Sequence, residues 1–158
     1  MMISKVRGTF RAFSGTVVIG EDPTQSTVEV NIEAASIDTG DSSRDEHLRG
    51  ADFLDVQRYP EIHYLSTSVQ PAGDRWAVTG MLTIKAVTRE VTLSVEFCGA
   101  QRDPWGSLRA GFLATAEIDR DDFDITWNQM LESGGFLVGK GVRVEIEAEL
   151  VLDPPAAE

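Results

Sequence analysis

The sequence predicts an all-β domain: an antiparallel up-and-down barrel of about eight strands, with one short helix in a long connector. Three observations predict it. Apolar and polar residues alternate with period two along most of the chain, only one segment has helical signals, and turns containing Gly or Pro separate the alternating segments. Strands with one apolar face must bury these faces together, and closing the sheet into a barrel does so.

The alternation is clear in four segments and weaker in four more. In the clear segments, aliphatic residues, alanine or phenylalanine occupy every second position, and mostly polar or small residues occupy the others. We expect clear strands at 28–34, 91–97, 108–118 and 142–150, and weaker ones at 5–10, 14–20, 61–69 and 75–84. Gly, Pro and Asp mark turns at 20–23, 71–74 and 102–106.

Only one segment has the signals of a helix. Ser43 and Glu46 have the spacing of a capping box, and Gly50 is placed to end the helix. This helix lies in the one long connection, around residues 36–60, and should sit at one end of the barrel. We expect a single domain over residues 1–152 and a disordered tail over 153–158.

Charge argues against several classes of partner. The 158 residues include 14 Lys or Arg and 26 Asp or Glu, for a net charge of -12. Nucleic acid and anionic membranes repel such a chain, so we expect no nucleic-acid partner and no stable membrane binding. No apolar run has membrane-spanning length and the first residues lack the apolar segment of a signal peptide, which favours the cytoplasm. The one cysteine, Cys98, excludes an internal disulfide or a Cys-based zinc site, and we expect an inert thiol that is at least half-buried.

Signals of catalysis are weak. The sequence has no G-x-S-x-G, H-E-x-x-H or P-loop motif. Its two histidines, His47 and His63, lie sixteen positions apart, which is not the spacing of a metal pair on one helix or one strand. The acidic segment 119–124 lacks the glycine and the distal glutamate of a calcium loop, so we expect a turn that caps a short helical bend. One enzymatic alternative stays open, a small hydrolase or stress-response enzyme that uses His47 with a carboxylate from Asp45 or Asp55.

Several segments, taken in order, resemble the YceI-like domain of bacterial polyisoprenoid-binding proteins. The matching segments are 5–10, 13–15, 36–39, 44–48, 52–56, 59–62, 80–85, 87–91, 119–123 and 144–146. The resemblance covers residues 4–151. It implies a streptavidin- or lipocalin-like antiparallel barrel with a helix-bearing connector, a long apolar pocket for an isoprenoid or fatty-acyl chain, and often a homodimer. No enzymatic activity is characteristic of the family, and the resemblance implies no cofactor other than a bound lipid.

Two departures from the family pattern matter. A further strand usually precedes the segment that begins at Lys5, and its absence here would leave the strand at 142–152 with a free edge. We expect two chains to close their open edges in a symmetric homodimer; an open seam or a strand missing from this sequence are the alternatives. Asp124 stands where glycine is common, and aspartate tolerates a positive φ better than most residues.

The leading functional hypothesis is non-enzymatic binding or carriage of an isoprenoid-quinone or fatty-acid type of lipid. Inward-facing residues should line its apolar site, and a polar head should lie at the barrel mouth, where the helix sits. The expected lining residues are Phe10, Val17, Val30, Ile32, Tyr64, Leu82, Leu93, Val95, Phe112 and Ile146, with Arg44, His47 and Arg49 at the mouth. The second alternative is a structural or interaction domain whose barrel is filled by its own side chains.

Overall fold

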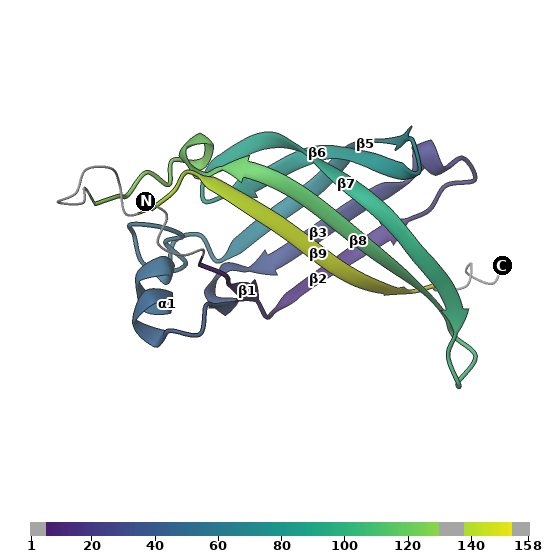
Figure 1. Ribbon diagram of the computed structural model, residues 1–158, viewed down its shortest axis with the longest axis horizontal. Coiled ribbons are helices and arrows are strands. Elements are labelled where there is room, and N and C mark those ends of the chain that lie inside the picture. The colour runs from purple at the N-terminus through teal and green to yellow at the C-terminus, as the bar shows by residue number, and fades with distance from the viewer. Residues whose placement is uncertain (1–5, 130–137, 153–158) are drawn as a thin grey trace.

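The computed structural model describes residues 6–129 and 138–152 of the chain. Its main feature is an antiparallel seven-stranded sheet in the order β2-β3-β5-β6-β7-β8-β9. The sheet curls into a half-barrel, with α1 beside one end, the helix end, and the β7–β8 hairpin projecting from the other, the hairpin end (Figure 1). The strands are β1 (Thr9–Phe10), β2 (Phe13–Val18), β3 (Thr27–Glu33), β4 (Ile37–Asp38), β5 (Glu61–Ala72), β6 (Arg75–Ile84), β7 (Val87–Arg102), β8 (Leu108–Asp119) and β9 (Gly141–Val151). The helices are α1 (Ser42–Arg49) and the short 3-10 turns η1 (Pro23–Gln25), η2 (Ala34–Ser36) and η3 (Arg120–Phe123).

The predicted all-β fold is confirmed, and most strands begin and end near their expected bounds. β7 is longer than expected because its pairing with β8 continues past a register shift between Phe97 and Gly99. A bulge of this kind adds one residue to a strand without ending the ladder. That added residue is Cys98, whose side chain is exposed, so the expectation of a buried or half-buried thiol is wrong.

The segment expected as a strand at 5–10 differs from its prediction. Within the described residues only Thr9 and Phe10 of this segment form a strand, and they pair with Asp38 and Ile37 in a separate two-stranded sheet. The long connector supplies β4 as their partner, so this segment adds no strand to the half-barrel. The main sheet therefore has seven strands instead of about eight.

The helix begins one residue earlier than its expected cap. Asp41, in an extended conformation, is the N-cap, and its Oδ1 accepts a hydrogen bond from the backbone N–H of Arg44 at 3.1 Å. Ser43 lies inside the first turn, so the capping box expected from Ser43 and Glu46 is wrong. Asp41 competes successfully because its carboxylate also has a favourable interaction with the helix dipole. Gly50 ends the helix as expected.

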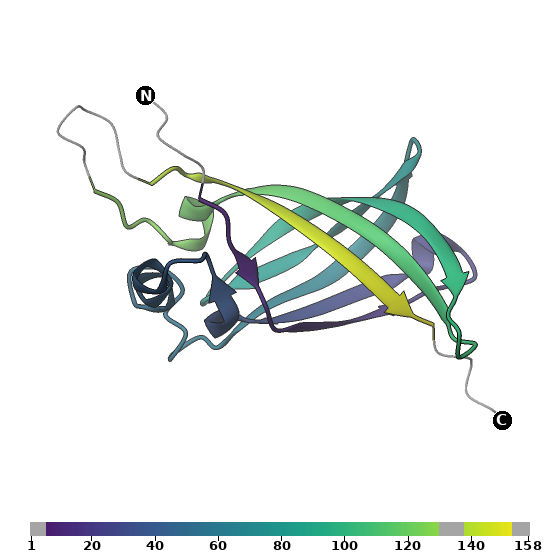
Figure 2. The same cartoon turned by 60° about the horizontal axis from the view of Figure 1, so that its bottom comes forward.

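β2 and β9 are the edges of the main sheet. Each has a single neighbour in the sheet order, β3 and β8 respectively. With seven antiparallel strands the two edge strands run in the same direction, so no antiparallel ladder closes the seam between them. Figure 2, which brings this side forward, shows β9 crossing obliquely over the opening. A free edge along β9 is thus confirmed for the described residues.

Two clusters of buried side chains form the core. The cluster at the helix end places Phe53 of the connector and Phe123 of η3 among residues of β5 and β6. The second lies in the middle of the curled sheet, around Tyr64, Val78 and Leu93. Together they fill the helix end and the centre of the half-barrel.

Candidate functional site

The inner face of the sheet carries the residues expected to line a ligand site. Strand register joins Val17 to Val28, Val30 to Tyr64, and Tyr64 to Leu82. On the other side, Val95 pairs with Ala114, and Ala114 with Ile146. The expected residues that belong to or pack against the two core clusters are Phe10, Val30, Ile32, Tyr64, Leu82, Leu93, Val95 and Ile146. The predicted inward direction of these strands is therefore confirmed, whereas their contact with a ligand stays a prediction.

Val17 and Phe112 lie outside both clusters. Phe112 is partly exposed and contacts Phe97, its partner across β7 and β8, with ring centroids 5.4 Å apart. Phe97 is 52% exposed although it lies on the inner face. At the hairpin end the inner face is therefore apolar and incompletely covered by the protein's own side chains.

Tyr64 is the one polar group of the central cluster. Its hydroxyl donates toward the backbone carbonyls of Val78 and Val91, both at 3.1 Å. Burial raises the pKa of Tyr64 to about 12, because the charged phenolate would lose its hydration. The hydroxyl is therefore neutral at physiological pH and satisfied by backbone acceptors.

His47 lies at the helix end in an aromatic cluster. Its ring is edge-on to Phe53 at 4.9 Å and to Trp127 at 4.7 Å between centroids. Its Nε2 lies 2.8 Å from Oδ2 of Asp52. A shallow hollow of about 450 Å³ opens beside it, lined by Ser43, Glu46, His47, Gly50, Ala51 and Asp52.

The carboxylates named for the hydrolase alternative are not the partners of His47. Asp45 is buried and accepts hydrogen bonds from the N–H and hydroxyl of Thr39 at 2.9 and 2.6 Å. Asp55 lies 3.8 Å from Arg58. The pairing of His47 with Asp45 or Asp55 that the sequence suggested is therefore wrong. The turn after α1 instead brings Asp52 to the imidazole of His47. Among the described residues, the hydrogen-bond partner of the His47 ring is the Asp52 carboxylate and not a hydroxyl or thiol.

The two arginines expected at the mouth bind three backbone carbonyls and one threonine hydroxyl. Arg44 donates from Nε to the Thr39 hydroxyl at 2.8 Å and from Nη2 to the Thr39 carbonyl at 3.0 Å. Arg49 donates to the carbonyls of Ala35 and Ile37 at 2.9 and 3.1 Å. These bonds attach α1 to the connector, so contact of Arg44, His47 and Arg49 with a lipid head stays a prediction.

The acidic segment 119–124 forms the expected capped turn. The side chain of Asp119 accepts the N–H of Asp121 at 2.9 Å, and η3 follows. Asp124 has φ 59° and ψ 27°, which confirms the left-handed conformation inferred from the glycine at this position in the family. Within the described parts of the chain, no group of three or more His, Cys, Asp or Glu side chains could hold a metal ion.

The same turn contains a feature that the sequence did not reveal. Arg120 is buried, and its guanidinium donates to the carbonyls of Ile125, Trp127, Val138 and Gly139 at 2.8 to 3.3 Å. It thereby joins the two chain segments that connect β8 and β9. A run of acidic neighbours in the sequence suggests ion pairs for this arginine, so its backbone partners emerge only from the fold.

Comparison with known proteins shows to which family this chain is related. The sequence profile of the YceI-like domain matches residues 1–150. The chain belongs to the YceI-like domain family. Proteins named Protein YceI from Salmonella arizonae and Salmonella newport are 45% identical to it over 120 residues, which make up 75% of this chain and 63% of theirs.

Two solved structures have the same fold. The Campylobacter jejuni YceI protein superposes with a TM-score of 0.82 at 24% identity, covering 98% of this chain and 89% of that one. Burkholderia cenocepacia BcnA superposes with a TM-score of 0.78 at 25% identity, covering 90% and 86%. These likenesses agree with the curled antiparallel sheet described above.

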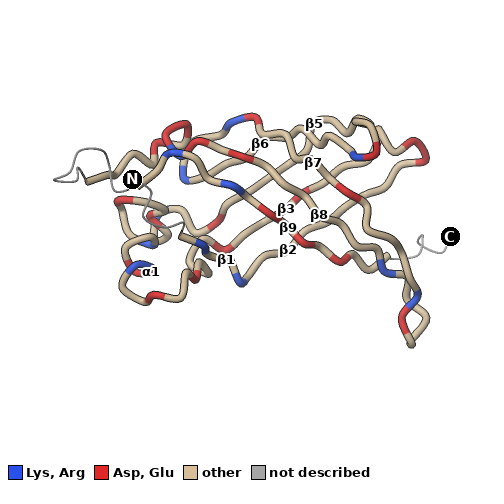
Figure 3. Tube along the Cα trace, viewed as in Figure 1, with Lys and Arg blue, Asp and Glu red and all other residues tan. Residues whose placement is uncertain are grey.

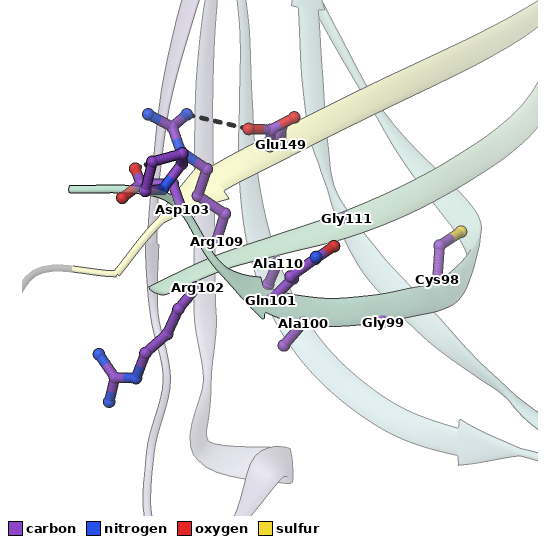
Figure 4. A pocket seen from close by; sticks show the side chains of 11 residues that line it. Cys98, Gly99, Ala100, Gln101, Arg102, Asp103, Arg109, Ala110, Gly111 and Glu149 are labelled. Carbon is purple, nitrogen blue, oxygen red and sulfur yellow. Dashed lines mark hydrogen bonds and ion pairs between the residues drawn. The ribbon is translucent and has the colours of Figure 1, made fainter. Parts of the chain in front are cut away.

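In this YceI-like domain the hairpin end has a second hollow, of about 530 Å³, on the β7–β8 hairpin (Figure 4). Arg109 lies at its rim and donates to Asp103 and Glu149, both at 2.9 Å. Its hydrogen bond holds the pKa of the Asp103 carboxyl below its usual range. Opposite Gly111 lies Gly99, with φ 120°, so the strands carry no side chain here. The lining residues are Cys98, Gly99, Ala100, Gln101, Arg102, Asp103, Pro104, Arg109, Ala110, Gly111 and Glu149.

No helix within the described residues is both long and apolar enough to cross a membrane.

Proposed function

We propose that the protein binds or carries an isoprenoid-type or fatty-acyl lipid on the inner face of the curled sheet and catalyses no reaction. The observation that carries the proposal is the half-exposed ring of Phe97 on the inner face, beside Phe112. Leaving a large aromatic side chain exposed to water on a concave apolar face is unfavourable, and a bound apolar ligand would cover it. Membership of the YceI-like family supports the proposal.

The composition of the inner face suits a long, unfunctionalised chain. Small residues at Ala110, Ala114 and Ala148 alternate with larger ones along β8 and β9. Each methylene removed from water contributes about 0.8 kcal/mol, so a chain of several isoprene units would bind without ion pairs. The open seam offers a route by which such a chain could enter sideways.

The direct test is organic extraction of freshly purified protein, followed by mass spectrometry, and titration of the emptied protein with a prenyl quinone and a fatty acid. We expect a lipid in the extract and saturable uptake of the added prenyl chain. Recovering no lipid, together with no uptake of either probe, would overturn the proposal and favour a barrel filled by its own side chains.

A matched pair of variants places the ligand. Phe97→Ser removes an exposed apolar side chain from the inner face, and Leu65→Ser removes one from the outer face, where Leu65 pairs with Glu29 and Met81. Both side chains are about half-exposed, so both changes leave the core intact. Covering the exposed half of a phenylalanine contributes about half of the 1.5 to 3 kcal/mol of full burial. Phe97→Ser should therefore weaken binding about three- to tenfold, and Leu65→Ser should not. Equal affinities would place the ligand elsewhere.

His47→Ala separates carriage from catalysis. A carrier loses at most some affinity for the lipid head, whereas an enzyme that uses the His47–Asp52 pair loses turnover by orders of magnitude. The variant should therefore keep prenyl-chain uptake within a few-fold of the parent protein. A cytoplasmic location, expected from the sequence, stays a prediction that cell fractionation tests.

A further inference from the structure

The turn between β7 and β8 presents one tryptophan to solvent. Trp105 is 84% exposed, more than any other large apolar side chain described. It belongs to the turn that joins β7 and β8. This hairpin projects beyond the body of the half-barrel, at the end opposite α1 (Figure 1). Neither core packing nor the proposed ligand site on the inner face accounts for it.

The backbone of this turn satisfies its own hydrogen bonds. Oδ1 of Asp103 accepts the N–H groups of Trp105 and Ser107, both at 2.9 Å, and the Asp103 carbonyl accepts the N–H of Gly106 at 3.0 Å. Pro104 has no N–H, and Arg102 donates to the Gly106 carbonyl at 2.9 Å. The turn therefore exposes few donors whose removal from water would be costly.

The charges at the hairpin end also compensate one another. Asp103, whose side chain is 9% exposed, is paired with Arg109, which also binds Glu149, and Arg102 is the fourth charged group. Among the described residues that line the hollow there, two cations thus accompany two anions, in a chain whose net charge is -12. Figure 3 shows both signs at this hairpin. A surface of this kind is not repelled by an uncharged bilayer, and it gains little from an anionic one.

We propose that the Trp105 turn docks in the headgroup region of a zwitterionic phospholipid bilayer. Tryptophan favours this region because its ring is apolar while its indole N–H stays hydrogen-bonded. Docking there brings the hairpin end of the inner face, with Phe97 and Phe112, to the surface that would supply or receive lipid. The proposal rests on the proposed function, since it names the surface with which that site exchanges its ligand.

The single exposed ring of Trp105 gives only transient contact with the bilayer. This agrees with the absence of stable membrane binding expected from the sequence. The bulge between Phe97 and Gly99, at the base of the hairpin, is compatible with a transient contact. The φ of Gly99, 120°, is a conformation that residues with a side chain rarely adopt, and nothing lies within 4 Å of a Cβ built there. The hairpin beyond it is therefore held mainly by its own ladder and by β9.

The first experiment uses brominated phosphatidylcholine vesicles, which quench tryptophan fluorescence only at close range. The parent protein should be quenched, and Trp105→Ala should lose this quenching although Trp76 and Trp127 remain. Leu65→Ala, which removes a half-exposed residue from the outer face, is the matched control and should be quenched like the parent. Quenching should change little between low and physiological salt, because no net charge is involved.

The second experiment separates docking from lipid binding. Trp105→Ala should take up a prenyl quinone added from solvent like the parent, but should extract it from vesicles at least several-fold more slowly. Normal uptake with no vesicle quenching of the parent protein would overturn docking and leave the proposed function intact. No uptake by either route would instead overturn the proposed function. If light scattering detects a dimer for the parent protein and not for Trp105→Ala, the Trp105 turn binds a second copy of this chain. That result would overturn docking to a bilayer.

Discussion

The ring of Tyr64 lies directly over Gly80. A Cβ built on Gly80 would meet Cζ of Tyr64 at 2.6 Å and its Oη at 2.7 Å, and would also approach the Leu65 carbonyl to 2.6 Å. Because Gly80 of β6 has no side chain, the Tyr64 ring has the space to reach the carbonyls of Val78 and Val91. One glycine and one tyrosine together define the centre of the half-barrel.

Gly80→Ala should therefore destabilise the protein strongly. The new methyl group would displace the Tyr64 ring and press on backbone, and overpacking of this kind costs about 1 to 3 kcal/mol. Gly111→Ala is the matched control, because a Cβ there meets only Cys98 Cβ at 3.7 Å, an ordinary contact. Urea unfolding measures both. Equal loss of stability in the two variants would show that Tyr64 does not need the space above Gly80.

Tyr64 should make stability depend on alkaline pH. Its pKa is raised from 10.0 in the unfolded chain to about 12 in the folded one, so folding favours the protonated hydroxyl. This contribution is fully present below pH 10 and is lost as the pH rises from 10 to 12. The free energy of unfolding of the parent protein should fall more steeply over this interval than that of Tyr64→Phe. Tyr59→Phe, the control, should keep the steep fall.

At neutral pH, Tyr64→Phe should cost about 1 kcal/mol, the net contribution of the hydroxyl's hydrogen bonds. Ultraviolet titration of the folded parent protein gives an independent measure. One tyrosine should ionise near pH 12, and its signal should be missing from Tyr64→Phe.

Arg120→Lys should be costly although it preserves the charge. A single ammonium group cannot reach the four carbonyls that the guanidinium now contacts, and a buried carbonyl without a partner costs about 1 to 3 kcal/mol. We expect a loss of about 3 kcal/mol, which lowers the Tm of a protein of this size by about 6 to 12 °C. Calorimetry of Arg143→Lys, on the exposed face of β9, should show almost no change. A small effect at both positions would mean that the turn does not depend on Arg120.

We propose that two copies form a homodimer through the free edge of β9. The unpaired backbone groups of an edge strand favour pairing with another strand, and two identical edges can pair antiparallel about a two-fold axis. The acidic outer row Glu145, Glu147 and Glu149 opposes this pairing by repulsion. Light scattering at micromolar concentration should therefore give a dimer whose fraction rises with salt. A mass of 17.3 kDa at every salt concentration would contradict it.

The sequence alone determined the seven strands of the main sheet and which of their residues face inward, although it did not predict β4 or the separate pairing of β1. Alternation with period two is a local property, so it survives whatever the strands pair with, and Val30, Leu93 and Ile146 face the core as expected. The left-handed turn at Asp124 was likewise predictable, because it depends on the backbone preference of one residue in a family-specific position. The family followed from short motifs in their order.

Only the tertiary structure decided which partners the side chains of α1 and its connector bind. His47 pairs with Asp52 instead of Asp45 or Asp55 because the path of the turn after α1 sets which carboxylate reaches the ring. Arg44 and Arg49 are occupied by carbonyls for the same reason. The hydrogen bonds by which Asp103 satisfies the turn under Trp105 likewise depend on how β7 and β8 pair. Period-two patterning carries no information about them, since it describes each strand separately.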